Sequence, residues 1–190
     1  MDVLTDRRQR IGAAQVRYLH TEVLAPLAAA GPFVPGEGPL DAPVMLVGEA
    51  PGAQEARLLR PFCGPSGQLL RRLMKEAGVP PPMCYITNAV HYRPPFNRTP
   101  HPYEVIASLP LLEEEAAAVL PQVIVALGAV ALRALAYRLP PPALGEMVSW
   151  QFPAWHRVML LPLRHPSWVL REGPAAEDEM REGLRKIIGG

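Results

Sequence analysis

Three polar side chains of different chemistry stand at or just after apolar runs of the sequence. Glu49 lies in GEAPG, Asn88 in ITNAV and His165 in RHPS. A carboxylate can activate water or stabilise a cation, an amide can donate to and accept from the edge of a base, and an imidazole can donate to a developing oxyanion. Together these groups suit the recognition of an unstacked nucleobase.

The loops around these residues add further candidates. Phe62 offers a flat face for stacking, and the turn that follows it leads into a helix N-terminus, where backbone amides bind anions. Pro51 and Gly52 tighten the first loop, so that a ligand can approach its backbone amides. The candidates for phosphate or substrate contact in the later loops are Gly64, Ser66, Gly67 and Ser167.

Each of these residues also has an ordinary structural interpretation. Glu49 can be a solvated residue of a turn, Asn88 can hold its own loop, and His165 can be a loop histidine. Phe62 can belong to the core and Ser66 can be a helix cap. Only their convergence at one end of one sheet favours a functional site.

The elements that bring them together are strands and helices in alternation. Four short apolar runs are typical of strands buried on both faces, and helical patterns lie between them. The predicted strands are residues 44–47, 85–90, 123–127 and 158–163, and the predicted helices are 3–29, 67–77, 103–120 (with a kink or break at Pro110), 129–137 and 175–188. This order predicts a three-layer α/β/α fold with a four-stranded, mainly parallel sheet, whose ligands bind at the carboxyl ends of the strands.

The chain length of 190 residues suits a single domain. Within residues 1–190 we expect an N-terminal helical region and connector over 1–42, and an α/β core over 43–190. Residues 139–151 read as an irregular, proline-rich insertion.

Composition places few limits on function. The net charge of +1 argues neither for nor against a nucleic-acid partner, because a local basic face is sufficient. The two cysteines form no metal-binding pattern, and the charged N-terminus lacks a secretory segment. The longest apolar stretch, 116–132, is interrupted and short for a membrane span. We therefore expect a cytoplasmic protein with reduced thiols and no membrane contact.

The order of five motifs resembles the uracil-DNA glycosylase superfamily. These are GEAPG, RPFxGxxGQLL, YITNAVxxRPPxNRTP, VIVALG and HPS, which run unbroken from about Pro43 to Gly173. The nearest branch is family four, the bacterial and archaeal iron–sulfur type. The resemblance implies an enzyme of base excision repair that flips uracil out of DNA and hydrolyses its N-glycosidic bond, leaving an abasic site.

The resemblance also implies roles for the residues. Phe62 stacks on uracil, Asn88 pairs with its edge, and His165 donates to the carbonyl oxygen that gains charge. Glu49 orients or deprotonates the attacking water or stabilises the sugar cation, and Glu55 matches a second acidic position. The substrate-binding set is then Gly48, Ala50, Pro51, Gly52, Glu55, Phe62, Ser66, Gly67 and Ser167.

Basic and apolar side chains near these motifs are candidates for DNA contact. Neither lysine, Lys75 nor Lys186, falls in a motif, which indicates a monofunctional glycosylase without Schiff-base chemistry. We expect a monomer that binds single- or double-stranded uracil-containing DNA. The candidate cations are Arg71, Arg72, Arg93, Arg98 and Arg171, and the candidate apolar wedge is Trp168, Val169 and Leu170.

The sequence departs from family four at the iron–sulfur cluster. Four cysteines hold the cluster in that family, but here Tyr92 and Ser108 stand at two of the positions, and no cysteine precedes Pro43. Cys63 and Cys84 lie where the family has aliphatic residues. We therefore expect no cluster, no metal and no other cofactor. Apolar packing of side chains such as Leu24 and Leu27 would order the N-terminal region instead.

Several alternatives stay open. The chain could be a non-catalytic module of the same fold that binds damaged or single-stranded DNA, or a glycosylase for hypoxanthine or xanthine. A nucleotide hydrolase would need a carboxylate cluster or a phosphate loop with lysine, and the sequence has neither. A relative that bonds covalently to abasic DNA uses a histidine in an inserted basic loop. His101 lies near that position, but the basic insertion is missing.

Overall fold

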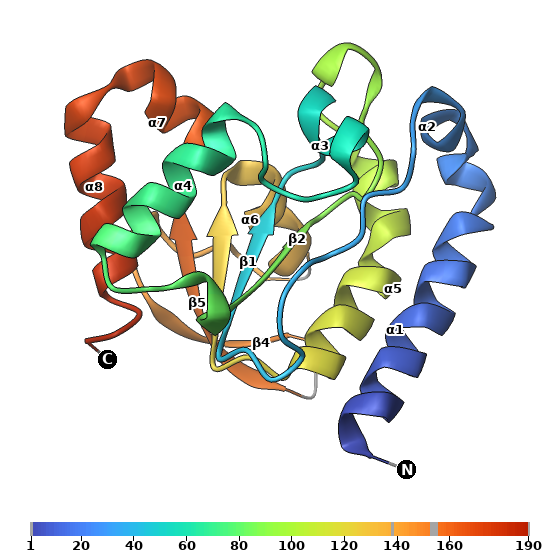
Figure 1. Ribbon diagram of the computed structural model, residues 1–190, viewed down its shortest axis with the longest axis horizontal. Helices are drawn as coiled ribbons and strands as arrows, with labels where there is room; N and C mark the ends of the chain where they lie inside the picture. The colour runs from blue at the N-terminus through green and yellow to red at the C-terminus, as the bar shows by residue number, and fades with distance from the viewer. Residues whose placement is uncertain (1, 138, 153–155, 190) are drawn as a thin grey trace.

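A five-stranded sheet forms the centre of the protein (Figure 1). The computed structural model describes residues 2–137, 139–152 and 156–189, so the two ends of the predicted domain, Met1 and Gly190, lie outside the described residues. The strand order is β2-β1-β3-β5-β4, in which β4 alone runs antiparallel to its neighbour. The strands are β1 (Val44–Gly48), β2 (Cys84–Asn88), β3 (Val123–Leu127), β4 (Val148–Gln151) and β5 (Arg157–Leu163).

The predicted α/β/α fold with a mainly parallel sheet is confirmed, but the predicted count of four strands is wrong. The fifth strand, β4, lies in the segment that we expected to be irregular. It is a short edge strand in which Val148 and Trp150 are half-buried while Ser149 and Gln151 are exposed. Four alternating residues beside a proline-rich stretch give too little pattern to distinguish a strand from a loop.

Helices cover both faces of the sheet because alternate strand residues point to opposite sides. Leu46 and Val125 pack with one group of helices, and Met45 and Ile124 pack with the other. The first group is α4 (Pro65–Glu76), α7 (Pro166–Glu172) and α8 (Pro174–Arg185), and the second is α5 (Pro102–Val119) and α6 (Ala129–Leu135). Pro110 lies inside α5, which continues through it to Val119 instead of breaking there.

The N-terminal region packs outside α5 and forms more than one helix. The predicted helix over 3–29 is divided into α1 (Val3–Leu19), a 3₁₀ turn η1 (Glu22–Leu24) and α2 (Ala25–Ala30). The remaining short elements are α3 (Ala53–Leu58) and the 3₁₀ turns η2 (Pro81–Met83) and η3 (Pro95–Asn97). None of the helices in the described part of the chain combines the length and apolar character that crossing a bilayer requires.

Candidate active site

The candidate site lies at the carboxyl ends of β1 and β2. Gly48 pairs with Asn88 at the last step of this parallel ladder. Two further bonds continue beyond it, from the Ala89 amide to the Gly48 carbonyl (2.9 Å) and from the Val90 amide to the Glu49 carbonyl (3.1 Å). The backbone of Glu49 is therefore fixed relative to Asn88, although Glu49 itself lies outside the strand.

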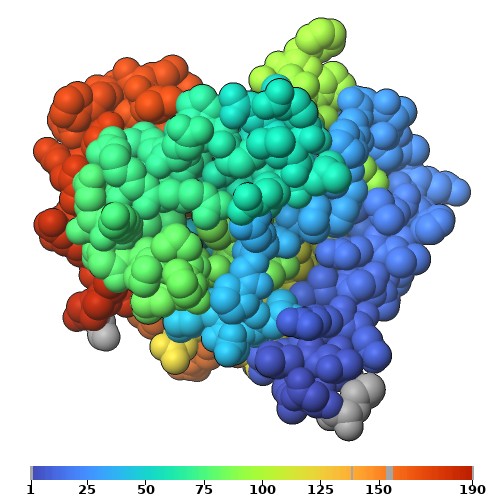
Figure 2. Space-filling model, viewed as in Figure 1, coloured from blue at the N-terminus to red at the C-terminus, as the bar shows by residue number. Residues whose placement is uncertain are grey.

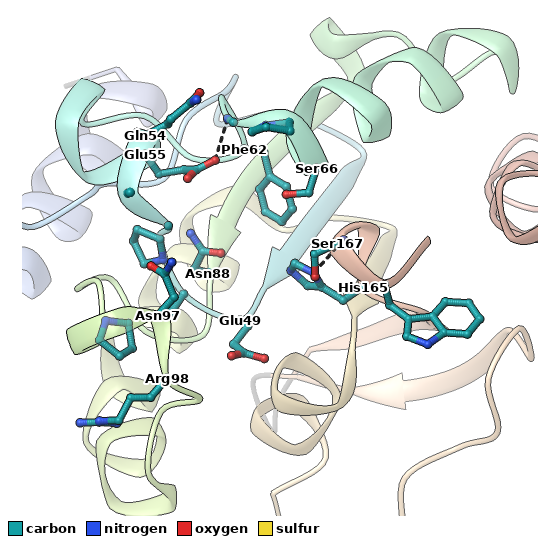
Figure 3. Close-up of a pocket in the computed structure, with 18 of the residues that line it drawn as sticks. Glu49, Gln54, Glu55, Phe62, Ser66, Asn88, Asn97, Arg98, His165 and Ser167 are labelled. Atoms are coloured by element: carbon teal, nitrogen blue, oxygen red, sulfur yellow. Dashed lines mark hydrogen bonds between the residues drawn. The ribbon is translucent and has the colours of Figure 1, made fainter. Parts of the chain in front are cut away.

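A cavity of about 520 Å³ opens at these strand ends, a volume typical of small-ligand sites (Figure 3). It brings together most of the side chains that the sequence singled out. Its lining includes fourteen residues that the sequence singled out: Glu49, Ala50, Pro51, Gly52, Glu55, Phe62, Gly64, Ser66, Asn88, Arg98, His165, Ser167, Trp168 and Arg171.

Phe62 and Asn88 meet above Gly48. A Cβ atom on Gly48 would lie 2.4 Å from Asn88 Oδ1 and 2.5 Å from Phe62 Cζ, closer than real carbon contacts allow. Gly67 is equally constrained, because its Cβ would lie 2.1 Å from the Phe62 carbonyl oxygen. Phe62 itself has φ 51°, in the left-handed region. The two glycines do not line the cavity; they make room for the side chains that do.

Asn88 is a buried residue whose side-chain amide has no hydrogen-bond partner among the described residues. The side chain is 3% exposed, and within the described part of the chain it makes no hydrogen bond. Neither amide atom is completely buried, so a ligand or water in the cavity can reach both of them. The donor and the acceptor of Asn88 are thus both available to a ligand in the cavity.

His165 faces the same cavity from the N-cap position, directly before α7. Its Nδ1 accepts a hydrogen bond from the Ser167 amide (3.1 Å), and its ring centre lies 6.2 Å from that of Phe62. Burial lowers the pKa of His165 to about 4, and the positive charge of Arg171 acts in the same direction, while Glu55 opposes it. His165 is therefore a neutral imidazole at neutral pH.

Glu49 is the carboxylate at the centre of the arrangement (Figure 3). Burial raises its pKa above the ordinary value for glutamate, and the nearby Arg133 guanidinium partly offsets that rise. Its side chain makes no hydrogen bond to the described residues. A half-buried carboxylate in this state can accept a proton from water or face a positive charge.

Glu55 makes a structural contact that its sequence position did not indicate. Its Oε1 accepts the Gly64 amide at 2.7 Å, at the start of α4 (Figure 3). We expected this helix N-terminus to be free for a substrate anion, but the protein's own carboxylate occupies the Gly64 amide. Glu55 therefore positions the loop that carries Phe62, and it also lines the cavity.

The predicted cations differ in what they contact. Arg98 lines the cavity and binds Glu104 through both guanidinium ends (2.8 and 2.6 Å), and Arg93 bonds Asn97 at 2.7 Å. Arg71 donates to two backbone carbonyls of the Phe62 loop, and Arg72 pairs with acidic residues of α4 and α8. Arg71 and Arg72 thus hold helices and loops together and do not line the cavity.

The predicted apolar wedge is only partly exposed. Val169 is completely buried in the core, so its assignment to a wedge is wrong. Trp168 lines the cavity but packs against the core and is covered by the Arg164 guanidinium, 4.1 Å from the ring centre. Leu170 is 48% exposed and does not line the cavity.

Sequence reasoning missed several residues of the site. Gln54, Pro94 and Asn97 line the cavity, and the last two lie in the motif RPPxNRTP. Their place inside that motif was the available signal. A buried network beneath the site was also missed, in which Thr87 and Tyr85 donate to the Glu115 carboxylate at 2.8 and 3.1 Å.

Two positions at which the resemblance expects cluster cysteines take part in aromatic packing and hydrogen bonds with Tyr18. Tyr18 of α1 stacks on Tyr92 (ring centres 5.4 Å apart) and bonds Ser108 Oγ at 3.2 Å. Those two residues stand where the resemblance expects cluster cysteines, and Phe33 and His91 complete the contact around Tyr18. Aromatic rings and a hydroxyl do not supply the thiolates that such a cluster needs, so these residues do not fit it.

No group of three or more histidine, cysteine, aspartate or glutamate side chains is arranged to hold a metal ion within residues 2–137, 139–152 and 156–189.

This fold and this site define an α/β protein with a cavity at the carboxyl ends of its parallel strands. The chain belongs to the Uracil DNA glycosylase superfamily, whose sequence model matches residues 35–186. A Type-4 uracil-DNA glycosylase of Pyrobaculum aerophilum is 41% identical over 83% of this chain and 82% of its own length. The same name belongs to relatives from Thermotoga maritima (39% identical; 70% of this chain, 64% of the relative) and Sulfurisphaera tokodaii (33% identical; 81% and 72%). These findings confirm the resemblance to family four.

Proposed function

We propose that this protein removes uracil from DNA by hydrolysing the N-glycosidic bond, which leaves an abasic site. The observation that carries the proposal is the convergence of Glu49, Phe62, Asn88 and His165 on one cavity. The names of its relatives, Type-4 uracil-DNA glycosylases, support the same activity.

Recognition of the base follows from the geometry of the cavity. The extruded uracil lies against the Phe62 ring, which Gly48 and Gly67 allow to reach over the strand end. The Asn88 amide pairs with the uracil edge, accepting from the ring N–H and donating to a carbonyl. Cytosine presents the opposite donor and acceptor pattern at that edge, so the same amide discriminates against it.

The chemical step separates charge. As the C1′–N1 bond breaks, its electron pair passes to the uracil ring, and the sugar gains positive charge. The Nε2–H of His165 donates to the uracil oxygen that becomes negative, and the Glu49 carboxylate faces the sugar or takes a proton from the attacking water. Preorganised groups of this kind supply a large share of catalytic rate. Water adds at C1′, and the released uracil anion takes up a proton.

The proposed reaction is monofunctional and needs no cofactor. Neither Lys75 nor Lys186 lines the cavity, which supports hydrolysis by water over attack by an amine. The packing of Tyr18 between Tyr92 and Ser108 supports a protein that works without an iron–sulfur cluster.

We extend the proposal to the organisation of the molecule. Tyr18, Leu24 and Leu27 share a buried cluster with Tyr92 and Leu111 of the core, which supports one domain over 1–190. We further propose that it acts as a cytoplasmic monomer on single- and double-stranded DNA.

The test is release of free base from oligonucleotides that contain one uracil, single-stranded, opposite guanine and opposite adenine. Parallel substrates carry hypoxanthine, xanthine or thymine. Release of uracil with an abasic product supports the proposal. Release of a purine alone would assign a different lesion, and DNA binding without any release would indicate a non-catalytic module.

A further inference from the structure

Phe96 is the most exposed large apolar side chain in the described part of the chain. It is 99% exposed and lies in η3, between β2 and α5. The segment that contains η3 projects from the outline of the molecule (lime in Figure 2). A phenylalanine ring that touches nothing in its own protein has its whole surface available to a partner.

The backbone presents this ring in a strained conformation. Phe96 has φ 55° and Asn97 has φ 56°, so two successive non-glycine residues are left-handed. Such conformations are unfavourable for a bulky residue and cluster at ligand-contact sites. The turn is closed by bonds from the Asn97 amide to the Pro94 carbonyl (3.1 Å) and from the Arg98 amide to the Pro95 carbonyl (3.1 Å).

Side chains on both sides of the turn hold it in place. Before it, Arg93 Nε donates to Asn97 Oδ1 at 2.7 Å. After it, Arg98 binds both oxygens of Glu104, whose Oε2 also accepts the His101 amide at 2.7 Å. Hydrogen bonds on both sides therefore fix the turn, while the Phe96 side chain at its tip is exposed.

The projection stands at the mouth of the cavity. Asn97 and Arg98, which follow Phe96 directly, line one side of the hollow, and His165 and Ser167 line the opposite side (Figure 3). Because Pro94, Asn97 and Arg98 line the cavity, DNA that delivers a nucleotide into it would come close to the turn. Arg93, which bonds Asn97 and makes no ion pair with the described residues, leaves a net positive charge at the turn for a phosphate.

We propose that Phe96 stacks on the DNA base that flanks the extruded nucleotide and so holds the strand at the cavity mouth. The inference rests on the proposed function, because it takes the occupant of the cavity to be a flipped nucleotide. A flat ring with both faces in solvent can accept any base, since every base has a π-face. Phe96 thereby compensates for base stacking that is lost when the nucleotide leaves the helix.

The first test compares Phe96→Ala with the wild-type protein on an uncleavable oligonucleotide that carries 2′-fluoro-deoxyuridine. We expect the Kd to rise about 5- to 150-fold, the range for loss of one base–aromatic stack. Phe96→Trp retains wild-type binding, and Phe96→Leu, which is apolar but not flat, falls between them. Inhibition by free uracil does not change. The control Val16→Ala removes an exposed apolar side chain from α1 and leaves the Kd unaltered.

The second test identifies the partner base. The nucleotide on the 5′ side or the 3′ side of the uracil is replaced by an abasic analogue. At one of these two positions, we expect removal of the base to raise the Kd of the wild type but not that of Phe96→Ala, because this variant has already lost the stacking contact. The inference would be overturned if, at both positions, removal of the base raised the Kd of Phe96→Ala by the same factor as it raises the Kd of the wild type.

Failure of this inference and failure of the proposed function give different results. A wild-type protein that releases uracil, with Phe96→Ala equal to it in Kd, removes Phe96 from DNA binding and leaves the function intact. A wild-type protein that releases no base, yet binds the 2′-fluoro-deoxyuridine oligonucleotide with intact flanking bases in a Phe96-dependent manner, refutes the function and retains the stacking contact. Unfolding by urea must match between the variants, since an exposed ring adds little to stability.

Discussion

The Nδ1 atom of His165 lies 2.7 Å from the Ser167 hydroxyl and accepts the Ser167 backbone amide at 3.1 Å. An amide can only donate, so Nδ1 carries no hydrogen, and the hydrogen of the neutral ring must be on Nε2. The contact thus fixes the tautomer that can donate to a substrate oxygen. It also makes protonation of the ring costly, because a hydrogen on Nδ1 would face the amide hydrogen.

The stability of the protein should therefore fall at mildly acidic pH. The pKa of His165 is about 4 in the folded protein and 6.5 ordinarily, so between these values the unfolded chain binds a proton that the folded protein does not. The free energy of unfolding then decreases as the pH is lowered from 6.5 to 4 and levels off below, by about 3 kcal/mol from this ring. Urea unfolding of the wild type and of His165→Asn across this window measures it. Identical pH slopes in the two proteins would contradict the assignment.

Loss of either group that contacts the base should abolish most activity without abolishing DNA binding. We expect Asn88→Ala and His165→Ala each to lower kcat by about 10²- to 10³-fold, the cost of removing one preorganised donor. The Kd for uncleavable uracil DNA should change far less. His20→Ala, at the exposed end of α1, is the matched control. Cleavage at the wild-type rate by either site variant would remove that residue from the mechanism.

Glu49 should set the acidic limb of the rate profile. Burial raises its pKa, so if its ionised form is required, kcat rises with pH through a midpoint above the ordinary value for glutamate. Glu49→Gln lowers kcat by about 10²- to 10⁴-fold and removes that limb. Arg133→Gln takes away a positive charge that favours the ionised form, so the midpoint moves to higher pH. A profile that is the same in Arg133→Gln and the wild type would exclude this coupling.

The sequence predicted the parts of the fold whose patterns are local and strong. Four continuous apolar runs identified the parallel strands, and their carboxyl ends correctly located Glu49, Asn88 and His165 near one another. The edge strand β4 was missed because its few residues alternate beside prolines. Pro110 suggested a kink or break in α5, but the helix continues through it to Val119.

The contacts that could not be predicted join residues distant in sequence. Glu55 reaches the Gly64 amide only because α3 folds back on the start of α4. Nothing in the pattern around Phe96 indicated that this ring would be exposed, since two prolines precede it and no apolar periodicity surrounds it. Tyr18 lies 90 residues from Ser108 in sequence, and helical periodicity cannot say which distant side chain such a residue meets.

Adding one methyl group to Gly48 should close the base site. The new Cβ would overlap Asn88 Oδ1 and the Phe62 ring, and both side chains define the cavity. We expect Gly48→Ala to raise the inhibition constant for free uracil at least 10-fold and to destabilise the protein by about 1–3 kcal/mol through overpacking. Gly12→Ala, in α1 with no atom within 4 Å of its Cβ, is the control and should be neutral or stabilising. Uracil inhibition of Gly48→Ala at the wild-type constant would show that the ring does not bind there.

Tyr18 should hold the N-terminal region against the core by packing and hydrogen bonds. Its hydroxyl accepts a hydrogen bond from the His91 amide (3.0 Å). The Ser108 hydroxyl donates its hydrogen to the Glu104 carbonyl (2.7 Å), so in the contact between the two hydroxyls Tyr18 is the donor and Ser108 Oγ the acceptor. Tyr18→Phe leaves a buried amide unpaired and should cost about 1–3 kcal/mol. Tyr18→Ala also leaves a cavity and should cost about 3–5 kcal/mol.

Urea unfolding measures both losses, and limited proteolysis shows whether cleavage begins in α1, as loss of its docking contact predicts. The protein purified under anaerobic conditions should be colourless and free of iron, because phenol and hydroxyl groups stand where thiolates are needed. Val16→Ala, on the exposed side of the same helix, should leave stability within about 0.5 kcal/mol of the wild type. Stoichiometric iron, or a Tyr18→Ala variant as stable as Val16→Ala, would show that something other than Tyr18 holds α1 to α5.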